Sequence, residues 1–341
     1  MRFSEVAVAA VAHVDAPIRV TTESIADELG PFLDRIGLPR RALQGLSGIV
    51  ARRFWPANTP PSHAATLAAE HAIAASGLDR AQLGVLINTS VCRDYVEPST
   101  ACIVHGNLGL GGHTLNFDLA NACLGFINGM ELVATMIERG DVEAGIVVDG
   151  ENSREVTEKT IARLLAGGTT DDFRAEFAAL TLGSGGAAAV LVSAKTQRER
   201  GERVRPYRGG LSIAATQHNR LCIGHSDRMV TDSNGLLHAG IDLAEQTWAR
   251  GKADFGWHER YFGTHVLHQV SKTHTEQLMK RLGLALETTL PIYAEHGNIG
   301  PAAVPMAWSK SLQAGRIADG DRVALMGIGS GLNCAMVEVQ W

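Results

Sequence analysis

The sequence predicts an α/β protein of two similar halves, each with a parallel sheet covered by helices. Two observations lead to this prediction. First, one order of elements occurs twice along the 341 residues: strand, helix, short strand, turn, helix and strand. Second, a candidate reactive residue stands at the same turn of each copy, because Cys123 lies 23 residues before Ile146 and Asn298 lies 25 residues before Val323. Alternating strands and helices of these lengths are typical of parallel sheets with helices packed on them.

Each copy is predicted from apolar runs and the polar turns that separate them. The first copy comprises, in order, a strand over 83–89, a helix over 99–108, a strand over 114–117, a helix over 124–139 and a strand over 145–148. The second comprises a strand over 265–268, a helix over 274–282, a short strand near residue 290, a helix over 301–314 and a strand over 322–326. The N-terminal apolar stretch is interrupted by charged residues and predicts a further strand rather than a signal peptide.

The halves are predicted to meet near the charged segment 195–203, which gives an N-terminal half over 1–195 and a C-terminal half over 196–341. Residues 151–180 interrupt the alternation in the first half. They are rich in charge and contain helical patterns, so we interpret them as an insertion. Such an insertion is either a plain surface excursion or a wall of the substrate channel.

Composition excludes several classes of function. The net charge is −5 and no cluster of Lys and Arg is visible, so we expect no nucleic-acid partner. No segment approaches about eighteen uninterrupted apolar residues, so we expect no membrane span. The five cysteines are scattered and none has CxxC spacing, which argues against a metal site or a disulfide framework. We therefore expect no metal, no cofactor and a reducing, cytoplasmic compartment.

Cys123 is the candidate nucleophile because it follows a strand and directly precedes a helix. A thiolate there faces unpaired backbone N–H groups and the positive end of the helix dipole, so we expect the pKa of this thiol to be lowered. A free cysteine is more often a buried structural residue. We assign that ordinary role to the other four, Cys92, Cys102, Cys222 and Cys334.

Two residues of the second half can serve the same chemistry. His268 ends a strand, and Asn298 stands in a glycine-bearing turn before a helix. Thioester chemistry needs hydrogen-bond donors where an oxyanion or enolate develops, and these side chains can supply them. The glycine-rich segment 327–333 lacks the downstream acid of a dinucleotide site. We interpret it as half of an oxyanion hole, with the N–H of Cys123 as the other half; the alternative is a tight turn into a closing strand.

Four segments resemble the β-ketoacyl synthase III-like branch of the thiolase superfamily. They are Asn-Ala-Cys-Leu-Gly-Phe around Cys123, His-Gln at His268, Glu-His-Gly-Asn-Ile-Gly around Asn298 and the terminal Gly-x-Gly-Ser-Gly loop. The similarity covers essentially the whole chain. It implies the thiolase fold, a five-layered αβαβα sandwich of two related halves, working as a homodimer.

Within that branch, segment 88–101 resembles the acyl-CoA condensing thiolases of bacterial long-chain olefin synthesis. Synthases that use malonyl groups usually have an apolar residue where Glu97 stands, because loss of carbon dioxide creates their carbanion. The resemblance implies that Glu97 reaches the active site of the partner subunit and removes a proton from the α-carbon. The alternative is that Glu97 only complements the N-terminus of the following helix.

The resemblance implies a non-decarboxylative Claisen condensation of two acyl-CoA molecules. Cys123 would accept the first acyl group, and the backbone N–H groups of Cys123 and Ser330 would stabilise the oxyanion. Glu97 would deprotonate the second acyl-CoA while His268 and Asn298 hold its thioester oxygen. Thioester hydrolysis would then give a 2-alkyl-3-oxo acid for downstream olefin-pathway enzymes. Two alternatives stay open: a decarboxylating 3-oxoacyl-(carrier protein) synthase III, and a cysteine-dependent acyltransferase that makes no carbon–carbon bond.

The binding of coenzyme A is the point where the chain departs from the family pattern. The synthases carry an arginine just before their Thr-Gly-Ile turn, whereas Leu46 precedes Ser-Gly-Ile here. The nearby Arg52, Arg53 and Trp55 are candidates for holding the nucleotide, without an assignment.

Overall fold

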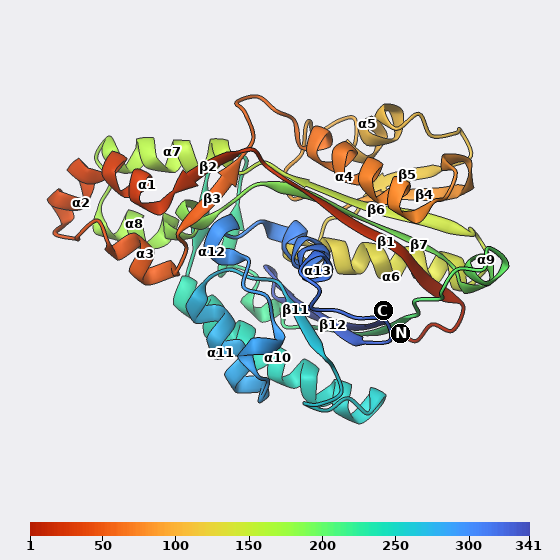
Figure 1. Cartoon of the computed structure of the whole chain (residues 1–341). Coiled ribbons are helices and arrows are strands. Elements are labelled where there is room, and N and C mark those ends of the chain that lie inside the picture. Colours follow the sequence, from red (N-terminus) through yellow and green to blue (C-terminus); the bar gives the residue numbers. More distant parts are fainter.

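A computed structural model describes all residues, 1–341, and contains two main sheets with helices between and around them (Figure 1). The first sheet has the strand order β1-β7-β6-β4-β5, with bounds Val6–Asp15, Gly185–Ser193, Ala144–Glu151, Leu83–Asn88 and Leu115–Asp118. The second has the order β11-β12-β13-β8, with bounds Thr264–Leu267, Arg322–Gly329, Asn333–Gln340 and Tyr207–Ala214.

The long helices form three layers around these two sheets (Figure 1). On the outer face of the first sheet lie α4 (Pro61–Ser76) and α5 (Thr100–Asn107). Between the sheets lie α6 (Gly125–Glu138) and α13 (Ala303–Gln313). On the outer face of the second sheet lie α10 (Ser233–Phe255) and α11 (Lys272–Leu282). The order of layers is αβαβα, which confirms the predicted five-layered sandwich.

Helix α4 lies close on the first sheet because both surfaces carry small residues. Its buried alanines recur three and four residues apart, at Ala65, Ala68, Ala69 and Ala72. Opposite them is Gly150 of β6, where an added Cβ would lie 2.1 Å from the backbone oxygen of Pro61. Even one methyl group on this glycine would push the helix away from the strand.

Both sheets are mixed, so the prediction of parallel sheets is only partly correct. Parallel pairing holds for β4 with β5, β4 with β6, and β11 with β12. The pairings of β7 with β1 and β6 and of β13 with β12 and β8 are antiparallel. Strands β12 and β13 pair antiparallel because the turn that joins them, Ser330–Leu332, has only three residues. This is too short for the crossover that a parallel connection needs.

The short strand predicted near Leu290 is absent. The buried side chain of Gln269 takes the place of a neighbouring strand: it donates to the backbone oxygen of Leu290 at 2.7 Å and accepts from the N–H groups of Ile292 at 2.8 Å and Tyr293 at 3.1 Å. Pro291 has no N–H to contribute to a ladder. The second sheet therefore has no counterpart of β5.

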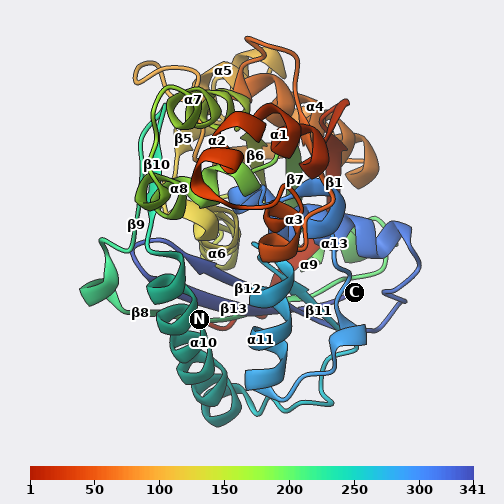
Figure 2. The same ribbon diagram turned by 90° about the vertical axis from the view of Figure 1, so that its left-hand side faces the viewer.

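The insertion, residues 151–180, is largely helical. It packs against three short helices from the N-terminal part of the chain at one end of the sandwich (Figure 2). It contains α7 (Arg154–Leu165) and α8 (Thr170–Glu176), which share a buried apolar cluster with the short helices α1 (Thr22–Glu28), α2 (Gly30–Ile36) and α3 (Ala42–Ser47). The cluster includes a contact between the rings of Phe32 and Phe173. The insertion thus adds a small core of its own beside the main sandwich.

Shorter elements complete the chain. They are β2 (Ile18–Thr21), β3 (Ala51–Phe54), α9 (Ala194–Glu199), β9 (Cys222–Gly224), β10 (Met229–Thr231) and α12 (Tyr293–His296). Helix α9 connects the last strand of the first sheet to the first strand of the second, and the division into domains at residue 195 stays a prediction. None of the helices combines the length and apolar character that a membrane crossing requires.

Candidate active site

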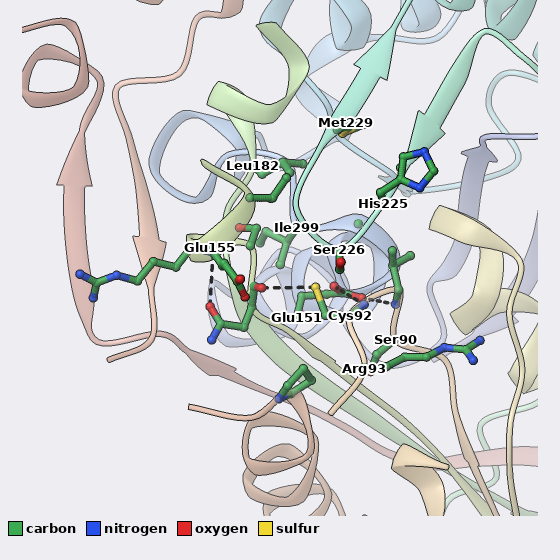
Figure 3. Close-up of a pocket in the computed structure, with 18 of the residues that line it drawn as sticks. Ser90, Cys92, Arg93, Glu151, Glu155, Leu182, His225, Ser226, Met229 and Ile299 are labelled. Atoms are coloured by element: carbon green, nitrogen blue, oxygen red, sulfur yellow. Dashed lines mark hydrogen bonds between the residues drawn. The ribbon is translucent and has the colours of Figure 1, made fainter. Parts of the chain in front are cut away.

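Cys123, Asn298 and Ser330 line one cavity of about 1210 Å³, although they come from distant parts of the chain. The ends of β4 and β6, the start of the insertion and the β9–β10 hairpin surround it (Figure 3). His268 is buried directly behind Asn298, and Glu97 lies outside the cavity of its own subunit. Since residues of the insertion line this space, the insertion is a wall of the cavity and not a plain surface excursion.

Cys123 lies in a tight turn, Ala122–Leu124, that leads into α6. Ala122 has a φ of 44°, a left-handed conformation that a residue with a Cβ adopts at a cost. A relay of amides secures the turn: Asn333 donates to Asn121 at 3.3 Å, and Asn121 donates to Asn128 of α6 at 2.7 Å. The strained turn is therefore fixed to both α6 and the β12–β13 hairpin.

The tip of that hairpin presses against the cysteine turn. A Cβ added to Gly329 would lie 3.2 Å from the backbone nitrogen of Leu124 and 3.3 Å from the backbone oxygen of Asn121, so a larger residue here would crowd this turn. Ser330 follows at the cavity wall. The backbone N–H groups of Cys123 and Ser330 donate to no other residue, which leaves both free for a ligand oxygen.

The expected lowering of the pKa of Cys123 is wrong. Burial raises the pKa of this thiol to about 12, and the neighbouring Cys222, Glu151 and Asp149 add to the increase. A helix dipole is worth about 0.3–1 kcal/mol to a charge, less than the roughly 1.4 kcal/mol of one pKa unit. Burial can shift a pKa by several units, so loss of solvent outweighs the dipole. Cys123 is a thiol at neutral pH and must lose its proton as it reacts.

His268 and Asn298 form a pair with defined donors. The Nε2 atom of His268 lies 3.3 Å from Oδ1 of Asn298, and this oxygen also accepts the N–H of Gly300 at 3.0 Å. An amide oxygen only accepts, so the imidazole proton is on Nε2 and the Nδ2 group of Asn298 stays available. Burial lowers the pKa of His268 to about 4. At neutral pH the pair is uncharged and presents N–H donors.

The backbone of Asn298 is held by the segment that ends the insertion. Its N–H donates to the oxygen of Thr181 at 2.9 Å, and its oxygen accepts from the N–H of Gly183 at 2.8 Å. The two segments meet closely, because a Cβ on Gly183 would lie 1.8 Å from the backbone oxygen of His296. The first half of the chain therefore fixes a candidate residue of the second.

Glu97 lies between β4 and α5 in an exposed segment. The side chains of Val91, Tyr95 and Val96 in this segment are 57%, 62% and 97% exposed. The N-terminus of α5 is capped without Glu97: Ser99 accepts from Cys102, and Asp118 accepts from the N–H groups of the first helical residues. The alternative role of Glu97 as a helix-terminus charge is thus already filled by other side chains.

The expectation that the four other cysteines are buried structural residues holds only for Cys334. Cys102 is exposed, and Cys92 and Cys222 line the cavity. No group of three or more His, Cys, Asp or Glu side chains is arranged to hold a metal ion.

The candidates for nucleotide binding are also placed differently from the expectation. Arg52 and Trp55 are 1% and 5% exposed and lie outside the cavity wall, so neither can reach a ligand there. Arg53 also lies outside the wall.

Two acids of the site were not selected from the sequence, Asp149 and Glu151 at the end of β6. Both are buried, and Glu151 lines the cavity. Burial raises the pKa of Glu151 to about 7. Their position in the sequence could have identified them, because both stand at the carboxyl end of a buried strand, where α/β sheets usually have their ligand-binding sites.

Comparison with known proteins agrees with this geometry. Residues 117–207 and 254–341 match the family models described as 3-oxoacyl-[acyl-carrier-protein (ACP)] synthase III and its C-terminal part. The chain is 46% identical over 342 residues to the acyl-CoA:acyl-CoA alkyltransferase of Xanthomonas campestris pv. campestris and 35% identical over 352 residues to that of Shewanella oneidensis, with 100% of each chain covered.

Solved structures of Xanthomonas campestris OleA share the fold. The cerulenin-bound form matches with a TM-score of 0.97 at 46% identity, over 100% of this chain and 98% of that one. A cysteine-to-serine variant with bound lauric acid and lauroyl-CoA matches with a TM-score of 0.96 at 46% identity, over 99% and 100% of the two chains. Other solved variants of that protein replace a glutamate or a histidine.

The raised pKa of Cys123 predicts slow alkylation of the free enzyme. Below its pKa, the thiolate fraction of a thiol grows about tenfold per pH unit. The rate of Cys123 modification by iodoacetamide, followed by peptide mass spectrometry, should therefore rise throughout pH 7–9, with the exposed Cys102 as internal reference. A plateau below pH 8 would show that the helix terminus outweighs burial.

The close approach at Gly183 predicts that Gly183→Ala displaces Asn298. We expect condensation to fall by about tenfold or more and the free energy of unfolding to fall by about 1–3 kcal/mol, as in other overpacked sites. Gly45→Ala is the matched control, because a Cβ there meets nothing within 4 Å. Product assays measure the activity and denaturant melts measure the stability. A Gly183→Ala variant as active and stable as Gly45→Ala would show that the contact at Gly183 does not hold Asn298 in place.

Proposed function

The chain belongs to the 3-oxoacyl-[acyl-carrier-protein] synthase III family of the thiolase superfamily, and from that premise we propose that it condenses two acyl-CoA molecules without decarboxylation. The observation behind the proposal is the cavity that brings Cys123 together with Asn298 and Ser330, with His268 bonded to Asn298. The relatives that match over their whole length are named for an acyl-CoA:acyl-CoA reaction.

In the first half-reaction, Sγ of Cys123 attacks the carbonyl carbon of one acyl-CoA. The carbonyl oxygen becomes an oxyanion and accepts from the free N–H groups of Cys123 and Ser330. The bond to the CoA sulfur then breaks, and the proton lost by Cys123 ends on the departing thiol. An acyl group bound to Cys123 remains.

In the second half-reaction, Glu97 of the partner subunit takes an α-proton from a second acyl-CoA. The enolate oxygen accepts from Nδ2 of Asn298 and from the Nε2–H of His268, which shares its proton between the enolate and Oδ1 of Asn298; both donors are neutral. The enolate carbon attacks the acyl carbonyl, the bond to Cys123 breaks, and the thiol regains a proton. Water then cleaves the remaining thioester and gives a 2-alkyl-3-oxo acid and CoA, with no cofactor in any step.

Two features support a homodimer. Segment 91–98 exposes three apolar side chains beside the cavity, as an interface segment would. Strand β5 is one of the two edge strands of the first sheet, and its Leu115 is 55% exposed. A second copy seated on this edge would cover both features and bring Glu97 toward the other cavity. We also propose a cytoplasmic enzyme, supported by its five free cysteines, whose product passes to olefin-forming enzymes.

The decarboxylating synthase is the alternative within the family. Its carbanion arises from loss of carbon dioxide, so it needs no carboxylate at the position of Glu97. Here the ordinary structural role of Glu97 is filled by Ser99 and Asp118, which favours a chemical role for this carboxylate.

Incubation of the protein with one long-chain acyl-CoA and no malonyl thioester tests the function. Mass spectrometry should find the 2-alkyl-3-oxo acid, or the ketone that it forms on loss of carbon dioxide. A product that forms only after a malonyl thioester is added would replace this proposal with the decarboxylating synthase. Acyl transfer without any carbon–carbon bond would replace it with the acyltransferase.

Glu97→Gln should separate the two half-reactions. The amide keeps the size of the side chain and cannot take a proton, so acylation of Cys123 should continue while condensation falls by about a hundredfold or more, within the usual range for a catalytic base. Intact-protein mass spectrometry reports the acyl-enzyme, and α-hydrogen exchange in heavy water reports the proton transfer. Normal exchange in this variant would assign the base to another residue.

A further inference from the structure

The carboxylate of Glu151 holds the backbone where segment 91–98 begins. It accepts from the N–H of Val91 at 2.6 Å and from the N–H of Cys92 at 3.2 Å. Glu151 is 4% exposed, and Figure 3 shows it beside Cys92 in the cavity wall. A buried carboxyl group that accepts from two backbone N–H groups is a strong local anchor, because a buried N–H that loses its acceptor destabilises the fold.

The same connection continues along the two strand ends. The hydroxyl of Thr89 donates to Asp149 at 2.6 Å, and the N–H of Gly150 donates to the hydroxyl of Ser90 at 2.8 Å. With Glu151, three consecutive residues of β6 hold the residues that follow β4. Side chains thus extend the pairing of these two strands beyond the last backbone pair, Asn88 with Val148.

This anchor holds the part of the segment that precedes Glu97. The next fixed point is Asp94, which accepts from the N–H of Ser62 at 2.9 Å. Beyond it, Tyr95 and Val96 project from the surface, followed by Glu97. The contacts of Glu151 and Asp94 thus fix the backbone on the N-terminal side of Glu97.

We infer that Glu151 is a positioning residue: by holding the backbone of Val91 and Cys92, it directs Glu97 into the cavity of the partner subunit. The inference rests on the proposed function, in which Glu97 acts across a dimer. Glu151 serves the site of the other subunit, although it lines the cavity of its own.

A local role is the competing explanation. A Cβ added to Gly300, next to Asn298, would lie 3.7 Å from Cδ of Glu151, so this carboxylate is also close to the pair that holds the thioester oxygen. A local role would serve the Cys123 of the same subunit. The two roles therefore act in different subunits and can be separated in mixed dimers.

The test uses mixed dimers with a different purification tag on each subunit. The reference pairs wild type with Cys123→Ala and has one working site. In the first test dimer, Cys123→Ala is paired with Glu151→Gln. In the second, wild type is paired with a subunit that carries both changes. Each test dimer contains one Glu151→Gln subunit, so a folding defect would affect both equally.

If Glu151 positions Glu97, the first test dimer keeps the activity of the reference, because its remaining Cys123 faces a partner with intact Glu151 and Glu97. The second should lose condensation by about tenfold or more, the scale for a buried N–H left without its acceptor, and should keep acylation of Cys123. The reverse pattern would show a local role, and equal effects in both dimers would also overturn the inference.

Two further groups of variants distinguish a failure of the proposed function from a failure of the positioning role alone. The same dimers with Glu97→Gln in place of Glu151→Gln test the cross-subunit base itself; if they fail to show the pattern, the proposed function fails. If they show it and the Glu151 dimers do not, only the positioning role is wrong. Glu338→Gln is the matched control, because Glu338 is also a buried carboxylate, 4% exposed, but lies outside the cavity wall and accepts from Trp257 and Arg322 rather than from segment 91–98; it should leave both half-reactions unchanged.

Discussion

Asn298 is held in one orientation by contacts from both halves of the chain, and the arrangement of donors in the site depends on this hold. The first half grips its backbone through Thr181 and Gly183, and Gly300 fixes its side-chain oxygen. With the oxygen occupied, the amide nitrogen has only one role left, to donate. The turns before α6 and α13 also touch each other, so the donor pair and the nucleophile share one rigid centre.

Low solvent access explains the charge state of this centre. Burial raises the pKa of Cys123 and lowers that of His268, so both of these side chains are uncharged in the resting site. Neutral donors suit an enolate or oxyanion, whose charge exists only during the reaction. A charged thiolate or imidazolium in the resting site would instead be stabilised before any substrate reacts, which would not favour the transition state.

The repeated order of elements was predictable because it depends on the spacing of apolar residues and on turn-forming residues, which are both local properties of the sequence. They placed Cys123 and Asn298 at equivalent helix starts and predicted two similar α/β halves, whereas the five-layered sandwich came from the family resemblance. The directions of β13 and the missing strand at Leu290 were not predictable in the same way, since they depend on a three-residue turn and on the side chain of Gln269. The burial of individual side chains could not be predicted either. Sequence alone could not show that Cys92 and Glu151 line the same cavity as Cys123, or that Ser99 caps helix α5 so that Glu97 is not needed for this role.

The most direct measurement is a crystal structure of the Cys123→Ala variant with an acyl-CoA bound. We expect a dimer in which the thioester oxygen lies within hydrogen-bonding distance of Nδ2 of Asn298 and Nε2 of His268. We also expect the carboxylate of Glu97 from the other subunit to lie beside the α-carbon. A thioester bound away from this pair, or a Glu97 carboxylate that remains in solvent in the assembled dimer, would contradict this mechanism.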